Sequence, residues 1–333
     1  MSPYVIYGLE LSYFTRKTEA AFELLGVPHV RKSKTLFNRG KLSKKGRTEQ
    51  VPVVLTPTGQ WMKDSTPIIE HLDENSDGRR LFPLGAEGVL PRLCEEWLDE
   101  WFPRAVIHFR WNYPECSEEA RDHLARELTP FIPGPIRSKL GRTVETWGKK
   151  AARALALDSA PQQQAVEDCF ERLFYVLDDQ LKDTRFALGD RPCAVDAVLI
   201  GGIRAHLGAD PEPRRRLEKH PAILAWADDV PSWSGDEPLC TLDDPNGFAR
   251  FILEEMGGEY ARFILPNAAA LAAGQKAVIV GEGPSAVSYR ARAYPETSRQ
   301  RLIQWLRALP KPTRETTAAR LSDLGLGEIF SMS

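Results

Sequence analysis

The chain has 333 residues, of which 42% are hydrophobic and 27% are charged, and its formal net charge is −2 at pH 7. These values are typical of a globular protein of about two domains, and they exclude an overall field that attracts nucleic acid or an anionic membrane. No run approaches the roughly 18 apolar residues of a membrane-spanning helix. No basic and apolar leader pattern opens the sequence, so we expect a cytoplasmic protein.

The first part of the chain alternates strand and helix patterns. Residues 4–7 predict a buried strand, residues 14–25 an amphipathic helix ended by Gly26, and residues 28–30 the start of a second strand. Residues 50–72 then predict a strand, a tight turn, a second strand and a helix. A β-α-β unit followed by a β-β-α unit indicates a compact α/β domain.

Two features of residues 50–72 go beyond an ordinary hairpin and helix. Pro52 interrupts a strand run, which predicts an edge, a bulge or a cis peptide. Asp64 and Ser65 stand at the start of the predicted helix, where backbone N–H groups favour an anion. The alternative for Ser65 is a plain helix cap, and the two roles are compatible.

A cationic segment, residues 31–47, separates the two units. It has eight lysine and arginine residues and no acid before Glu49. We expect a solvated, mobile segment, with a cationic rim for a small anionic ligand as the alternative. Nucleic acid is disfavoured, because Phe37 is the only residue of the segment that can stack on a base.

After residue 85 the pattern becomes helical. The predicted helices are one long helix over residues 90–111, then residues 162–181, a helix after Pro192, and residues 221–230, 246–256, 259–273, 298–309 and 313–324. Short strands are predicted at residues 277–280 and 287–289. The five cysteines are scattered, odd in number and without a C-x-x-C pair, so we expect reduced, packed thiols and no metal.

The order of these elements resembles the cytosolic glutathione transferase family over about residues 4–230. Val51-Pro52 is similar to the family's cis-proline, Asp64-Ser65 to its acid-serine motif, and residues 189–196 to its capping segment. The resemblance implies a thioredoxin-like α/β glutathione-binding domain (residues 1–83) and an all-α helical domain with the electrophile pocket (residues 86–240). Residues 241–333 would then form a mostly helical extension packed on this body.

The family resemblance also implies glutathione as co-substrate, with no metal. The α-carboxylate of glutathione would bind at Ser65, and its ammonium would bind Asp64, with Glu49 as the alternative acid. The bend at Gln50, Val51 and Pro52 would offer its backbone to the cysteinyl residue. A small hydrophobic electrophile would be the second substrate of a homodimeric, cytoplasmic detoxification enzyme.

Thiol activation is implied for the loop before the first helix, where family members carry Ser-Pro or Cys-Pro. This chain has Ser12-Tyr13, so Ser12 is the first candidate donor, Tyr13 the second and Tyr7 the third. Without a cysteine here, mixed-disulfide chemistry with glutathione is disfavoured. The alternative is that Ser12 only caps the helix and Tyr13 packs.

The second-substrate pocket is expected on the first long helix of the body. Trp101, Arg104 and His108 lie near one helical stripe and are candidate contacts, whereas Trp97 is expected in the core. Two classes of function remain: a glutathione transferase, and a non-catalytic binding or structural protein with the same fold. A nucleic-acid partner bound through residues 31–47 is a third possibility, which the composition disfavours.

Overall fold

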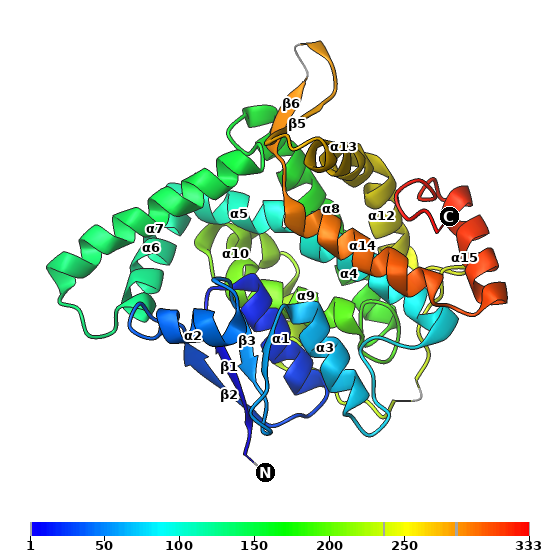
Figure 1. The fold of residues 1–333 in the computed structure, drawn as a ribbon, viewed down its shortest axis with the longest axis horizontal. Helices are drawn as coiled ribbons and strands as arrows, with labels where there is room; N and C mark the ends of the chain where they lie inside the picture. Colours follow the sequence, from blue (N-terminus) through cyan, green and yellow to red (C-terminus); the bar gives the residue numbers. More distant parts are fainter. Residues whose placement is uncertain (1, 236, 284–285, 333) are drawn as a thin grey trace. The chain divides into compact units, whose positions relative to one another are not determined.

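The computed structural model describes residues 2–235, 237–283 and 286–332 (Figure 1). Its first elements are β1 (Tyr4–Gly8), α1 (Tyr13–Leu24), β2 (His29–Ser33), α2 (Arg39–Gly46), β3 (Val53–Leu55), β4 (Trp61–Lys63) and α3 (Ser65–Glu74). The later elements are η1 (Gly85–Gly88), α4 (Val89–Glu100), α5 (Pro103–Asn112), α6 (Pro114–Leu128), α7 (Gly134–Ala154), α8 (Ala160–Asp183), α9 (Ala194–Gly202), η2 (Ile203–Leu207), α10 (Pro211–Leu217), α11 (Pro221–Asp228), α12 (Gly247–Glu255), η3 (Met256–Tyr260), α13 (Ala261–Ala272), β5 (Ala277–Val280), β6 (Val287–Arg290), α14 (Ala293–Arg307) and α15 (Lys311–Asp323).

The chain forms two compact units that alternate along the sequence. The first unit comprises Met1–Phe82, Val106–Lys150 and Pro192–Asp236, and the second comprises Pro83–Ala105, Ala151–Arg191 and Glu237–Ser333. The boundaries at residues 83, 86, 240 and 241 stay a prediction. No helix of the described residues is both long and apolar enough to cross a bilayer.

The first unit contains a four-stranded sheet in the order β2-β1-β3-β4, with only the β1–β2 pair parallel. Tyr4 of β1 packs on Phe22 of α1, whereas Val53, which pairs with Tyr7 of β1, lies against Gly46 of α2. Successive residues of a strand point to opposite faces, so α1 and α2 cover opposite faces of the sheet. This is the predicted thioredoxin-like α/β domain, and the helices that follow complete the predicted fold class.

Helices of the first unit pack closely on α1. A Cβ atom at Gly201 of α9 would lie 2.2 Å from the backbone nitrogen of Lys17, so only glycine permits this approach. A second apolar cluster joins α5, α6 and α7 to the loop before α1; its members are Trp111, Ala120, Leu124, Val144, Leu9, Leu11, Ile107 and Leu128. The loop that leads into α1 is therefore held by helices far away in the sequence.

In the described residues of the second unit, the named elements are helices and the β5–β6 hairpin. Here α12 contacts α4 and α8, α14 contacts α4, and α13 contacts β5. Figure 1 shows the hairpin in orange next to α13. The helices after residue 240 thus share a core with α4 and α8.

One expectation about local structure is wrong. The long helix predicted over residues 90–111 is broken into α4 and α5, because Pro103 cannot donate the helical hydrogen bond and its ring clashes with the preceding turn. Most residues of the cationic segment lie in β2 and α2, and apart from Lys34, Leu42 and Gly46 they are partly or fully exposed. The helices α6, α7 and α10 were not predicted.

Candidate functional site

The peptide bond between Val51 and Pro52 is cis, which is one of the three predicted alternatives. Pro52 is buried and lies immediately before β3, so the strand begins at Val53 and not at Val51 as expected. Because Pro52 stands outside the strand, its missing N–H removes no hydrogen bond from the sheet.

The strand register brings the predicted glutathione-binding segments to one end of the sheet. Val53 of β3 lies opposite Tyr7 of β1 on one side and opposite Lys63 of β4 on the other. The next residues along these strands at this end are Gly8, Pro52 and Asp64. The loop before α1 and the start of α3 therefore leave the sheet beside the cis-proline.

The carbonyl groups before the cis bond are held by Lys34, whose ammonium group donates to the carbonyl oxygens of Glu49 at 2.6 Å and Gln50 at 3.2 Å. The lysine is buried, and this burial lowers its pKa. It belongs to the segment that we expected to be solvated, and no local signal distinguishes it from its cationic neighbours. The bend at Gln50 and Val51 is thus fixed by a residue that sequence reasoning missed.

The N-terminus of α3 places Ser65 as its first residue, and this residue is 3% exposed. Asp64 precedes it with a φ of 72°, and its side chain does not cap the helix. The first N–H groups of a helix have no partner within the helix and lie at the positive end of its dipole. Ser65 therefore adds a hydroxyl to a helix terminus whose partial positive charge favours an anion.

Ser12 is the N-cap of α1, and its Oγ accepts a hydrogen bond from the backbone nitrogen of Thr15 at 3.3 Å. A hydroxyl that accepts this bond still has its own hydrogen to donate. Tyr13 is buried, with its ring 5.3 Å from that of Phe14 and close to Gly202. The structure therefore gives Tyr13 a packing role, while the hydroxyl of Ser12 can act as a donor.

The third candidate donor, Tyr7, lies on the face of the sheet that α2 covers. Its ring stacks on that of Trp61 with the centroids 5.7 Å apart. Ser12 is therefore the donor that the local geometry favours.

The loop from Leu9 to Ser12 is anchored by two side chains that the sequence did not indicate. Both carboxylate oxygens of Glu127 accept from the backbone nitrogen of Glu10, at 3.1 and 3.0 Å. Arg110 donates to the carbonyl oxygen of Leu11 at 2.7 Å. Helices α5 and α6 thereby fix the backbone that leads into the N-cap of α1.

Two of the three second-substrate candidates come together in the second unit. The guanidinium group of Arg104 lies over the ring of Trp101 at 4.2 Å, and both residues are buried. Residues of the C-terminal extension pack around Trp101, with the ring of Tyr260 at 6.0 Å and that of Tyr289 at 6.1 Å. The cavity next to this pair is about 40 Å³, which holds a water molecule or two but no organic electrophile.

His108 belongs to the first unit, where it is 1% exposed. Its Nδ1 atom is 2.9 Å from the Nδ2 atom of Asn112, and its ring packs against Phe109 and Tyr113. The assignment of Trp101, Arg104 and His108 to one second-substrate pocket stays a prediction.

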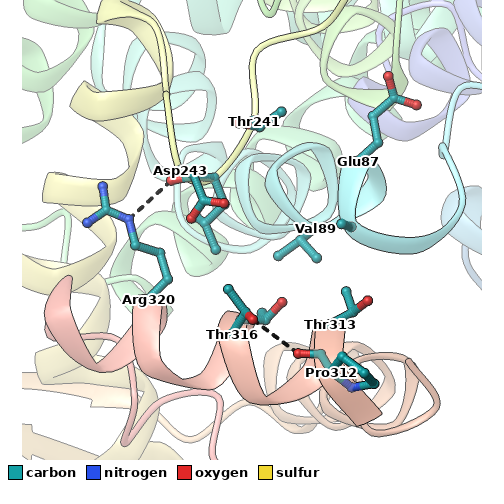
Figure 2. Close-up of a pocket in the computed structure, with 11 residues that line it drawn as sticks. Glu87, Val89, Thr241, Asp243, Pro312, Thr313, Thr316 and Arg320 are labelled. Atoms are coloured by element: carbon teal, nitrogen blue, oxygen red, sulfur yellow. Dashed lines mark hydrogen bonds between the residues drawn. The ribbon is translucent and has the colours of Figure 1, made fainter. Parts of the chain in front are cut away.

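A cavity of about 570 Å³ lies in the second unit. Figure 2 shows that α15 forms one wall with Thr313, Thr316 and Arg320. Glu87 and Asp243 also line it. Arg320 is held by a 3.3 Å hydrogen bond from its Nε to the carbonyl oxygen of Leu242. None of the predicted site residues lines this cavity.

Residues 6–80 match the family model of the glutathione S-transferase N-terminal domain. The N-terminal domain of this chain belongs to the glutathione S-transferase family. No curated protein sequence matches the chain.

Among solved structures, a glutathione transferase from Phanerochaete chrysosporium, GSTFuA3, is similar at 17% identity, with 70% of this chain and 100% of that chain covered and a TM-score of 0.48. The β-etherase LigF from Sphingobium sp. strain SYK-6 is similar at 16% identity, with 70% and 97% covered and a TM-score of 0.47. A glutathione S-transferase from Methylobacterium radiotolerans, solved with glutathione sulfonate, is similar at 17% identity, with 68% and 89% covered and a TM-score of 0.41.

Proposed function

We propose that the protein is a glutathione transferase that binds glutathione at the N-terminal domain and activates its thiol for attack on a hydrophobic electrophile. The observation that carries this proposal is the convergence of Pro52, Asp64 and the Ser12 loop at one end of a glutathione S-transferase N-terminal domain. A cytoplasmic homodimer that acts in detoxification, without a metal cofactor, completes the proposal.

Glutathione has three groups for this end of the sheet to bind. Its α-carboxylate accepts from the hydroxyl of Ser65 and from the first N–H groups of α3. Its ammonium pairs with Asp64. Its cysteinyl backbone lies along the bend at Val51 and Pro52, next to the side chain of Gln50, in the manner of an added strand.

The thiol is activated by Ser12. A free thiol has a pKa of about 8.5, so only a few per cent is ionised at neutral pH. A hydrogen bond from Ser12 and the positive end of α1 both stabilise the thiolate, which lowers this pKa. The sulfur then forms a bond to an electrophilic carbon, the leaving group departs, and the thiol proton goes to solvent. Tyr13 is the alternative donor.

Glutathione binding is tested by retention on immobilised glutathione. Ser65→Ala removes one hydrogen bond to a charged group, so we expect affinity to fall about tenfold or more, while Ser65→Thr keeps the hydroxyl and the affinity. Failure of the wild-type protein to bind glutathione would contradict the proposal.

Turnover is tested with 1-chloro-2,4-dinitrobenzene as the electrophile. Ser12→Ala should bind glutathione and lose turnover by about a hundredfold or more. Ser12→Asp caps a helix as well as serine does but cannot donate, so it should be equally inactive. Ser12→Thr keeps the hydroxyl and is the active control. Turnover by Ser12→Ala at the wild-type rate would show that another residue activates the thiol.

A non-catalytic glutathione-binding or structural protein is the second candidate function. Two observations favour it: Ser12 already caps α1, and the C-terminal extension covers Trp101 and Arg104. This candidate predicts retention on glutathione, lost in Ser65→Ala, without turnover of any electrophile.

A further inference from the structure

Arg110, on α5, is a buried arginine that uses all five of its N–H groups. Nε and Nη2 donate to the carboxylate of Asp210 at 2.9 and 3.0 Å, and Nη2 also donates to the carbonyl oxygen of Ala205 at 2.6 Å. Nη1 donates to Leu11 at 2.7 Å and to the Nε2 atom of His206 at 3.2 Å. One guanidinium group therefore joins α5, η2 and the loop before α1.

The charges around Arg110 are arranged to keep this group in place. Asp210 neutralises it through two parallel hydrogen bonds, a geometry that arginine provides and lysine does not. A guanidinium group only donates, so the Nε2 atom of His206 must be unprotonated. Burial lowers the pKa of His206 well below its usual value, and the charge of Arg110 lowers it further.

The contact to Leu11 acts on the peptide unit that enters Ser12. The carbonyl group of Leu11 and the N–H of Ser12 share one rigid plane, so the hydrogen bond from Arg110 sets the orientation of that plane. The N–H of Ser12 closes a turn to the carbonyl oxygen of Leu9 at 3.2 Å. The backbone position of Ser12 therefore depends on Arg110.

We propose that Arg110 is a positioning residue for the thiol-activating loop, because its guanidinium group is fixed by Asp210 and in turn fixes the Leu11–Ser12 peptide. This role rests on the proposed function, since Ser12 is the donor that it places. Arg110 touches neither glutathione nor the electrophile in this account, so its effect appears in the chemical step and not in glutathione affinity.

The test compares Arg110→Lys with a matched control, Arg299→Lys. Arg299 is also buried, donates to both oxygens of Glu296 at 2.8 and 2.7 Å, and donates to the carbonyl oxygen of Ile329 at 2.6 Å. It lies in the second unit, which does not contain Ser12, so it reports the effect of losing an equivalent buried, doubly hydrogen-bonded arginine that does not contact the loop before α1. The full chain is assayed for kcat with 1-chloro-2,4-dinitrobenzene, for the Kd of glutathione, and for the thiol pKa of bound glutathione by thiolate absorbance.

We expect Arg110→Lys to lower kcat about tenfold to a hundredfold and to raise the thiol pKa of bound glutathione, with its Kd changed less than about threefold. Arg299→Lys should leave all three unchanged. A purely structural role predicts that both variants lose only folded protein. An unchanged kcat and thiol pKa in folded Arg110→Lys would overturn the proposal.

A second variant guards against misfolding of Arg110→Lys. The pair Arg110→Met and Asp210→Leu replaces both charges with apolar groups, which buried ion pairs often tolerate, but it also loses the contact to Leu11. We expect the same loss of kcat and faster hydrogen exchange at the amide of Ser12. Unchanged exchange would overturn the positioning role alone, whereas no turnover by wild-type protein would overturn the proposed function and this role with it.

Discussion

Asp210 in the first unit and Glu96 in the second are both buried carboxylates, but their partners differ. Asp210 faces the guanidinium group of Arg110 through two parallel hydrogen bonds. Within the described part of the chain, Glu96 accepts hydrogen bonds from two hydroxyl groups, that of Tyr260 at 2.6 Å and that of Ser298 at 2.6 Å. Burial raises the pKa of both carboxyl groups, but the charge of Arg110 and its hydrogen bonds oppose the rise at Asp210, so that site favours a charged pair whereas the site of Glu96 accommodates a proton.

The pKa of Glu96 shows the consequence. Burial raises it from an ordinary value of 4.5 to about 7, against the opposing effect of the hydrogen bonds from Ser298 and Tyr260. Three further acids of the same helix, Glu95, Asp99 and Glu100, are also buried. Hydroxyl donors alone do not offset the free-energy cost of removing water from a carboxylate. A guanidinium group with two fixed hydrogen bonds offsets much more of this cost.

The largest effect is expected from Asp210→Asn. The amide leaves the buried charge of Arg110 unpaired, so the variant should lose about 3 to 5 kcal/mol of unfolding free energy. Urea unfolding at pH 7 measures this loss. Glu115→Gln is the control, since it breaks an exposed pair with Arg215 and should change stability little. If Asp210→Asn lost no more unfolding free energy than Glu115→Gln, the contrast between Asp210 and Glu96 would be contradicted.

Glu96→Gln should change the unfolding free energy at neutral pH in the opposite direction from Asp210→Asn. Because the folded pKa of Glu96 lies above the unfolded value, the folded state binds the proton more tightly, and stability falls as pH rises from about 4.5 to about 7. The change amounts to roughly 3 kcal/mol. The amide variant is always neutral and can still bind both hydroxyl groups, so it lacks this slope.

The measurement is the difference in unfolding free energy between Glu96→Gln and wild-type protein at pH 5 and at pH 7.5. We expect the variant to gain stability relative to wild type as the pH rises. Glu100, whose pKa is raised by burial and by the charge of Glu96, should ionise more readily in the variant, which adds to the relative gain in stability as the pH rises. A variant that is less stable than wild type at pH 7.5 would show that Glu96 is held as a carboxylate.

Tyr260→Phe should have the smallest effect. It removes one hydroxyl donor from Glu96 and should cost about 1 kcal/mol at low pH. The cost should grow as pH rises, because the ionised carboxylate needs the donor more than the neutral acid does. Tyr289→Phe is the matched control: its hydroxyl donates to the neutral amide of Gln162 at 3.2 Å, so its cost should not change with pH. Thermal unfolding at pH 5 and pH 7.5 measures whether the stability cost of each variant changes with pH.

The sequence predicts those parts of the site that depend on local chemistry. A proline in a strand run and an acid-serine pair before a helix have local signatures, so Asp64 and Ser65 were placed at the start of a helix and Pro52 next to a strand, although that strand begins only at Val53. The thioredoxin-like order of strands and helices was predicted for the same reason. Each of these features is determined by neighbours within a few residues.

Other parts depend on which distant elements pack together, and the sequence alone does not specify this. Lys34, Arg110 and Glu127 are ordinary charged residues of a cationic run or a helix until burial and distant backbone groups give them a role. The stripe that grouped Trp101 with His108 assumed an unbroken helix. Pro103 ends that regularity, so helical spacing across it does not define one face.

The most direct test of the account is calorimetric titration of glutathione into wild-type protein and into Ser65→Ala. The account predicts saturable binding at one site per chain, weakened about tenfold to a hundredfold by the substitution and retained in Ser12→Ala. Absence of binding by the wild-type protein, or binding that Ser65→Ala leaves unchanged, would contradict it.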